Sequence, residues 1–186
     1  MNIGFALCGS FCTYEKVFPL MEALAKRHRV IPIFSFAAAS VDSRFGEAAV
    51  HLARAESICG EKPLCSIPAV EPIGPKQMLD VLLIAPCTGN TLAKLAHSIA
   101  DTPVTMAAKS HLRNGRPVVL GISTNDALAG AAENIGKLLG RKHYYFIPFG
   151  QDDPVNKPTS MVADFSRTEE TLLLATEGVQ IQPMLV

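Results

Sequence analysis

The sequence has no excess of either charge and no long apolar run, and both absences exclude functions. Its 186 residues include 17 basic and 17 acidic side chains, so the formal net charge is zero. Nucleic-acid-binding domains normally carry a basic excess, which argues against that role. The longest apolar runs lie around residues 81–85 and 118–122. They are far shorter than the roughly 20 residues that a membrane-spanning helix needs.

The sequence also lacks a secretory leader and a metal-ligand pattern. Residues 1–8 run directly into a strand-like pattern, with no basic segment followed by an apolar core. The 5 cysteines form no Cys-x-x-Cys pair, and no two histidines have the spacing of metal ligands. An odd number of cysteines without a dense framework is typical of reduced thiols in the cytosol. We therefore expect a cytoplasmic protein without a bound metal.

Strand-like and helix-like segments alternate along almost the whole chain. Short apolar runs predict buried strands over residues 2–8, 30–36, 80–85, 117–122 and 144–148. Helical periodicity follows over residues 14–29, 45–58, 90–99, 103–115, 126–139 and 166–175. The last of these helices opens on a capping-box pattern, Ser166-Arg-Thr-Glu169. Residues 59–74 and the polar segment 150–160 predict irregular structure.

This alternation predicts a doubly wound α/β fold. Strands that alternate with helices form a mostly parallel sheet, and right-handed crossovers place helices on both of its faces. We expect one such three-layer domain, Rossmann-like or flavodoxin-like, over residues 1–186. Ligands of these folds bind beyond the carboxyl ends of the strands, so the loops there are the candidate site.

The loop after the first strand contains Gly9, Ser10 and Thr13 and leads into a helix. Glycine permits a tight turn, and the free amides at a helix N-terminus favour an anion. The loop has neither the Gly-x-Gly-x-x-Gly fingerprint of dinucleotide binders nor the Gly-Lys-Ser/Thr of P-loops. An anion-binding loop and an ordinary capped turn therefore both remain open.

The loop after the third strand is richer in polar groups. Thr88, Asn90 and Thr91 surround Gly89 at the start of a helix. One of these side chains could cap that helix, but three exceed what a single cap requires. Together they suit a planar polar ligand or a phosphate. Ser35, which lies between two phenylalanines after the second strand, is a weaker signal, since such a serine is more often a satisfied core residue.

The segment 80–96, followed by Ile99-Ala-Asp101, resembles the signature of the FMN-binding flavoprotein family of cysteine decarboxylases. That signature is a series of Ala-Pro, Thr or Ser, Asn-Thr and Ala-Lys that ends in an aspartate. The resemblance spans residues 1–186 and implies FMN as cofactor and a trimer-based homo-oligomer. It also implies the residues around FMN, from phosphate to flavin ring: Gly9, Ser10, Thr13, Ser35, Thr88, Asn90 and Thr91.

Two departures from the family pattern argue against decarboxylation of a cysteine-containing substrate. Residues 71–79 lack the family's histidine, and Ile122-Ser-Thr-Asn125 replaces its Pro-Ala-Met-Asn. Segments 71–75, 105–109 and 122–128 instead resemble a branch of the family that forms one part of a two-chain, oxidoreductase-type synthase. The resemblance implies that this synthase makes a pyridine dicarboxylate in the mother cell of a sporulating bacterium. Because the chain has no nicotinamide fingerprint, we expect NAD(P) on the partner subunit.

Candidate residues for the chemistry follow from residue type. Candidates for catalysis are Asn125, His111, which could transfer protons, and Cys87, whose pKa a helix N-terminus could lower. A dicarboxylate needs cations, and the local candidates are Lys94, Lys109 and Arg113, although the last two could simply complement a helix dipole. Two other functions stay open: an autonomous FMN-dependent decarboxylase, and a non-catalytic scaffold for an NAD(P)-binding partner.

Overall fold

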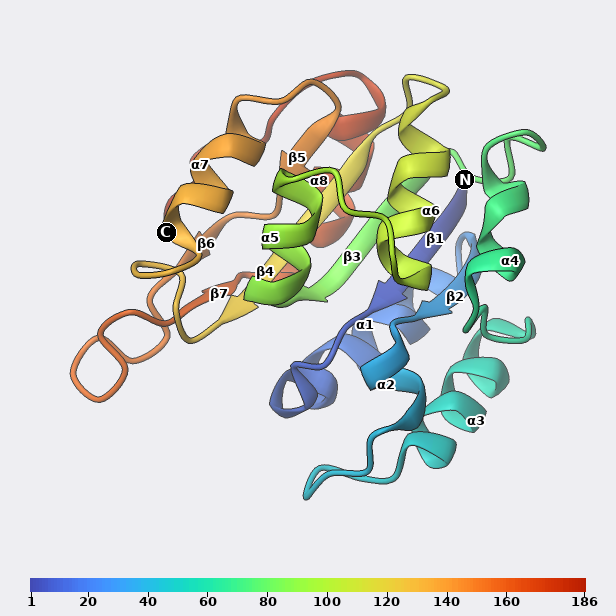
Figure 1. Cartoon of the computed structure of the whole chain (residues 1–186), viewed down its shortest axis with the longest axis horizontal. Helices are drawn as coiled ribbons and strands as arrows, with labels where there is room; N and C mark the ends of the chain where they lie inside the picture. The colour runs from blue at the N-terminus through green and yellow to red at the C-terminus, as the bar shows by residue number, and fades with distance from the viewer.

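A mostly parallel sheet between two layers of helices forms the centre of the molecule (Figure 1). The structure, a computed structural model, describes residues 1–186. Its parallel strands are β1 (Asn2–Leu7), β2 (Arg29–Phe34), β3 (Val81–Cys87), β4 (Val118–Thr124) and β5 (Tyr144–Phe146). They lie side by side in the order β2-β1-β3-β4-β5. The predicted doubly wound α/β fold is confirmed.

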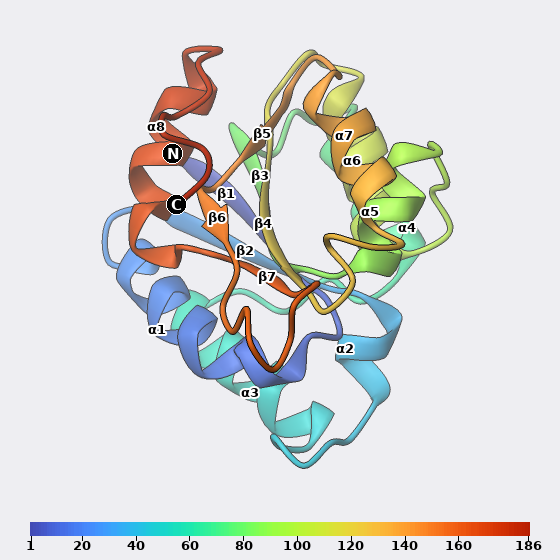
Figure 2. The same ribbon diagram turned by 90° about the vertical axis from the view of Figure 1, so that its left-hand side faces the viewer.

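The three central strands are buried on both faces, which explains why their sequences are almost continuously apolar. Figure 2 shows α1 and α8 on one face of the sheet, and α5, α6 and α7 on the other. The helices are α1 (Tyr14–Ala25), α2 (Phe36–Ser40), α3 (Ala48–Cys59), α4 (Ile67–Val70), α5 (Gly89–Ala96), α6 (Pro103–Leu112), α7 (Ala132–Leu139) and α8 (Thr168–Thr176). None of these helices is both long enough and apolar enough to cross a bilayer.

Two short strands that the sequence did not predict extend the sheet. β7 (Met161–Ala163) pairs antiparallel with the end of β4, and β6 (Phe149–Gly150) pairs antiparallel with β7. The polar segment 150–160 is therefore the connection between two strands. Both strands are too short to show an alternating pattern in the sequence.

Two short helices that the sequence did not predict begin at serine caps, one after the second strand and one in the segment 59–74. β2 ends at Phe34, because the Ser35 hydroxyl oxygen accepts a hydrogen bond from the Ala38 N–H (3.2 Å) and starts α2. In the predicted irregular segment, Ser66 caps α4 in the same way, by accepting from the Ala69 N–H (3.3 Å). A 3-10 turn, η2 (Glu71–Ile73), follows α4.

Two predicted helix starts were wrong. Residues 126–131 form turns, and α7 begins only at Ala132. The capping box expected at Ser166 does not form, because Ser166 lies inside a 3-10 turn, η3 (Phe165–Arg167). The Asp164 carboxylate accepts from the Ser166 N–H (3.1 Å) and O–H (2.6 Å), so aspartate caps this turn and α8 begins after it.

Candidate functional site

The carboxyl ends of β1, β2 and β3 surround a cavity of about 460 Å³, which we call the strand-end cavity. The structure brings together six residues that the sequence singled out: Gly9, Ser35, Thr88, Asn90, Thr91 and Lys94. Sequence reasoning missed the other lining residues, which are Cys8, Phe36, Ala37 and Thr102. No carboxylate lines the cavity, and its polar side chains are the hydroxyl groups of serine and threonine, the Asn90 amide and the Lys94 ammonium.

Thr88 and Thr91 use their hydroxyl groups inside the protein. The Thr88 oxygen caps α5 by accepting from the Thr91 N–H (3.3 Å), and its O–H donates to the Thr91 hydroxyl (3.1 Å). The Thr91 hydroxyl in turn donates to the sulfur of Cys8 (3.3 Å). The capping interpretation therefore describes both threonines. Asn90 is exposed at the first turn of α5, and its side-chain amide is free to bind a ligand.

Ser35 and Lys94 carry the remaining polar groups of the strand-end cavity. Ser35 accepts from the Ala38 N–H, but its own O–H donates to no protein atom, so it can donate to a ligand. The Lys94 ammonium donates to both carboxylate oxygens of Asp101 (2.7 and 2.8 Å). This hydrogen bond lowers the pKa of Asp101, and it explains why an aspartate closes the motif. The charge of Lys94 is thus partly neutralised.

Ser10 and Thr13 lie in a neighbouring cavity of about 190 Å³. Their hydroxyl groups and that of Ser123 form a closed triangle, with oxygen–oxygen distances of 3.1, 2.9 and 2.7 Å. Asn125, at the end of β4, lines the same cavity. The sequence analysis missed Ser123, although the rule that strand ends hold ligands would have found it in Ile122-Ser-Thr-Asn125.

Cys87 and His111 do not join these clusters. Cys87 is fully buried, and burial raises its pKa well above its usual range, so its environment favours the neutral thiol over a thiolate. His111 lies at the opposite edge of the sheet, where its Nε2–H donates to the carbonyl of Pro117, the residue before β4 (3.1 Å). Burial lowers its pKa to about 4.

The three candidate cations for a dicarboxylate do not converge either. Lys94 lines the strand-end cavity, whereas Lys109, in the last turn of α6, lines a different cavity. Arg113 follows the last residue of α6 and packs beside Gly74. The structure therefore offers no single pocket in which all three contact one small ligand.

This fold, with polar loops at the carboxyl edge of a parallel sheet, defines a class of small-molecule-binding α/β proteins. The family model described as Flavoprotein matches residues 1–144, and the chain belongs to this family. It is 49% identical over 186 residues to the B subunit of dipicolinate synthase from Bacillus subtilis (strain 168), and the match covers 100% of this chain and 93% of that protein. The full-length resemblance seen in the sequence is confirmed.

Solved structures agree with this placement. The B subunit of dipicolinate synthase from Bacillus halodurans C superposes with a TM-score of 0.91 at 45% identity, covering 100% of this chain and 95% of that chain. The FMN-dependent cysteine decarboxylase SpaF superposes with a TM-score of 0.68 over 95% of this chain and 97% of its own. Its 21% identity shows a shared fold.

Proposed function

We propose that the chain is the B subunit of a dipicolinate synthase and binds FMN in the strand-end cavity. The full-length identity of 49% to the B subunit of a dipicolinate synthase supports the first part of the proposal. The synthase converts a cyclic tetrahydrodipicolinate-type precursor to pyridine-2,6-dicarboxylate. That conversion requires the loss of water and a two-electron oxidation.

The residues of the strand-end cavity fit FMN. A volume of about 460 Å³ lies within the roughly 300–1,000 Å³ typical of small-molecule sites. The uncommitted O–H of Ser35, the amide of Asn90 and the N-terminus of α5 supply donors, and no carboxylate repels a phosphate. Gly9 has no side chain to fill the space beside Ala37. A bound flavin would supply a two-electron acceptor, which is the chemistry that the oxidation needs.

The same proposal includes a partner chain and self-assembly. Both relatives are B subunits by name, which supports a second component, the A subunit. We place NAD(P) on that component, because this chain lacks the nicotinamide fingerprint. The dicarboxylate would be held by Lys94 with contributions from neighbouring chains, since Lys109 and Arg113 lie elsewhere. We also propose a trimer-based homo-oligomer in the cytoplasm.

A non-catalytic scaffold is the second candidate function, and two observations favour it. The hydroxyl groups of Thr88 and Thr91 donate to other protein atoms, and the Lys94 ammonium forms an ion pair with Asp101. A site with so few free groups could hold only an anion while the chain stabilises its partner. The two functions differ in whether the purified chain binds FMN.

Titration of the purified chain with FMN tests the proposal, followed by visible absorbance and flavin fluorescence. We expect saturable quenching and a red-shifted flavin band. Asn90→Asp should weaken FMN binding at least tenfold, because it exchanges a donor for a carboxylate among acceptor-rich ligand atoms. Asn134→Asp, a matched change on α7, should leave binding unchanged. Fluorescence that stays unchanged on titration would exclude the flavin part and favour the scaffold.

The synthase activity needs its own measurement. Coexpression with the A subunit, and assay of each chain alone and of the mixture, should give product only from the mixture. Product from the partner alone would contradict a catalytic role for this chain, whether or not it binds FMN.

A further inference from the structure

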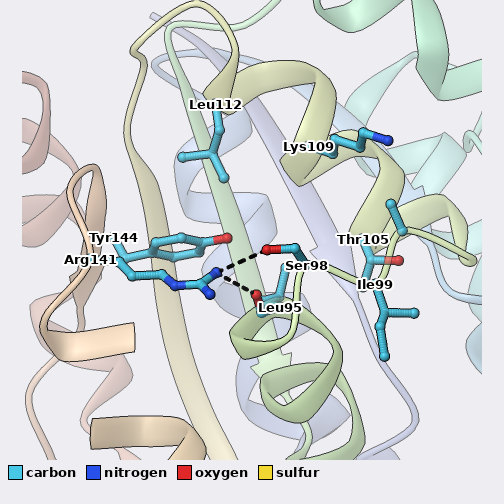
Figure 3. Close-up of a pocket in the computed structure, with 9 residues that line it drawn as sticks. Leu95, Ser98, Ile99, Thr105, Lys109, Leu112, Arg141 and Tyr144 are labelled. Atoms are coloured by element: carbon cyan, nitrogen blue, oxygen red, sulfur yellow. Dashed lines mark hydrogen bonds between the residues drawn. The ribbon is translucent and has the colours of Figure 1, made fainter. Parts of the chain in front are cut away.

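A third cavity, of about 200 Å³, lies at the C-terminal end of α5, away from the strand-end cavity (Figure 3). We call it the α5–α6 cavity, because these helices and the start of β5 line it. Its apolar walls come from Leu95, Ile99 and Leu112 and from the ring of Tyr144. A closed protein cavity of about 150 Å³ holds one benzene ring. The α5–α6 cavity therefore has room for a single ring with a substituent, and it is too small for FMN.

The charged groups of this cavity are all positive. Lys109 and Arg141 line it, and no aspartate or glutamate does. The Arg141 guanidinium is fixed in place, because it donates to the carbonyl oxygens of Leu95 (3.0 Å) and Ala96 (2.7 Å). Lys109 lines the opposite wall and forms no ion pair, but it is exposed, and Figure 3 shows its ammonium group pointing away from Arg141 and Tyr144. The Arg141 guanidinium has no carboxylate partner, which favours an anionic ligand.

Two of the three hydroxyl groups that line the cavity are available to a ligand, whereas the Thr105 hydroxyl is bonded to Thr102. Ser98 accepts from Arg141 (3.3 Å), which leaves its O–H free to donate. The Tyr144 hydroxyl forms no hydrogen bond with the protein although the residue is half-buried, and Figure 3 shows it beside Ser98 and the guanidinium of Arg141. A tyrosine hydroxyl in such a position usually has a partner. Ser98 also adopts a left-handed backbone (φ 59°), an unfavourable conformation that places its side chain at the cavity.

We propose that the α5–α6 cavity binds a small aromatic carboxylate with a single ring. The ring would pack among Leu95, Ile99 and Leu112, and the carboxylate would accept from Tyr144 and Ser98 near the Arg141 guanidinium. This inference does not rest on the proposed function. A pyridine dicarboxylate is one member of the ligand class, so if the chain belongs to a synthase the product would be a candidate ligand.

Calorimetric titration of the full chain in metal-free buffer tests the proposal, with benzoate and pyridine-2,6-dicarboxylate as probes and benzamide as the uncharged analogue. We expect saturable binding of at least one carboxylate and at least tenfold weaker binding of benzamide. Ser98→Ala and Tyr144→Phe should each raise the Kd of that carboxylate about tenfold. Ser57→Ala, at an exposed serine on α3, is the matched control and should not change it.

Three outcomes of these titrations would overturn the inference. They are the absence of binding by both carboxylates, equal affinity for benzamide, or a Kd that neither variant changes while both variants unfold at the wild-type temperature. Displacement of the carboxylate by FMN would also overturn it, because the ligand would then occupy the strand-end cavity. A failed FMN titration would reject the flavin proposal and leave this one standing, so the two results are separable.

Discussion

Gly74 lies where a 3-10 turn passes under α6, and its lack of a side chain is a packing requirement. An added Cβ would lie 2.5 Å from the backbone carbonyl oxygen of Ser110 and 3.0 Å from the Arg113 side chain. The carbonyl belongs to the α6 backbone and cannot turn away. The Asn114 amide also donates to the Gly74 carbonyl (2.7 Å), which ties the turn to the end of the helix.

Gly74→Ala should therefore lower the free energy of unfolding by about 1–3 kcal/mol, the usual cost of overpacking. Gly136 is the matched control, because it lies inside α7 with nothing within 4 Å of an added Cβ. Gly136→Ala should raise the free energy of unfolding by about 0.5–1 kcal/mol, since alanine favours a helix. Urea denaturation of both variants measures the difference. Equal changes in the two would show that α6 moves freely over the turn.

The sequence predicted which hydroxyl groups line the site, but not which of them are free to bind a ligand. Thr88, Thr91 and Ser35 were expected to contact a ligand, and all three line the strand-end cavity. Their positions follow from the rule for strand ends. Which donors remain free does not follow from the sequence, because it depends on the Thr88–Thr91–Cys8 chain of hydrogen bonds. Cys8 directly follows the buried strand β1, and its apolar neighbours in the sequence gave no indication of a polar contact.

At the scale of elements, α5 ends in an arrangement that glycine would fit better. The Ile99 N–H donates to the Lys94 carbonyl (2.8 Å) and the Ser98 N–H to the Leu95 carbonyl (3.1 Å), which is the Schellman pattern. The left-handed position of that pattern normally holds glycine, and here it holds Ser98 with φ 59°. The serine is therefore held in a backbone conformation that is unfavourable for any residue with a side chain.

Ser98→Gly should raise the free energy of unfolding by about 1 kcal/mol, because it removes the cost of a left-handed serine. The same change should weaken carboxylate binding in the α5–α6 cavity, because the hydroxyl is lost. Thermal denaturation and the calorimetric titration, performed on the same preparation, measure the two effects. A variant that is less stable than the wild type would contradict the backbone argument.

Helices and strands were predictable where the hydrophobic pattern is long. They were missed where the element is short or depends on pairing with a distant segment. β1, β3 and β4 have long apolar runs and were located to within two residues at each end. α2 and α4 have five and four residues and depend on one serine cap each, so no periodicity reveals them. β6 and β7 exist because β7 pairs with the distant end of β4, a contact that local sequence does not encode.

At the scale of the whole molecule, ion pairs such as Arg29–Glu61 and Lys137–Glu133 lie at the surface, whereas buried ionisable groups dominate the response of stability to pH. His111 is the clearest case. Its Nε2–H donates to the Pro117 carbonyl, while Nδ1 is buried without a partner. A second proton would add a buried N–H with no acceptor, and nearby Arg116 opposes the charge. Burial first, and then Arg116, therefore lower the pKa of His111 from 6.5 to about 4.

The fold should consequently lose stability as the pH falls from about 6.5 to about 4. In this range the unfolded chain binds a proton at residue 111 that the folded chain does not, so unfolding becomes easier. A pKa that drops from 6.5 to about 4 corresponds to about 3 kcal/mol in the free energy of unfolding. The protein has this stability in full above pH 6.5 and loses it as the pH falls toward 4. His51, whose pKa burial also lowers, acts in the same direction. The carboxylates with lowered pKa, such as Asp101, lose their contribution only below about pH 4.

Chemical denaturation of the wild type and of His111→Gln at several values between pH 7 and pH 4.5 isolates this contribution. Glutamine can still donate to the Pro117 carbonyl, but it does not titrate. The variant will be less stable at pH 7 because it packs less well, so the informative quantity is the slope against pH. We expect a clearly shallower fall in the free energy of unfolding for the variant. Parallel slopes for the two proteins would mean that His111 takes up its proton in the folded state, and that the packing around Nδ1 opens to admit it.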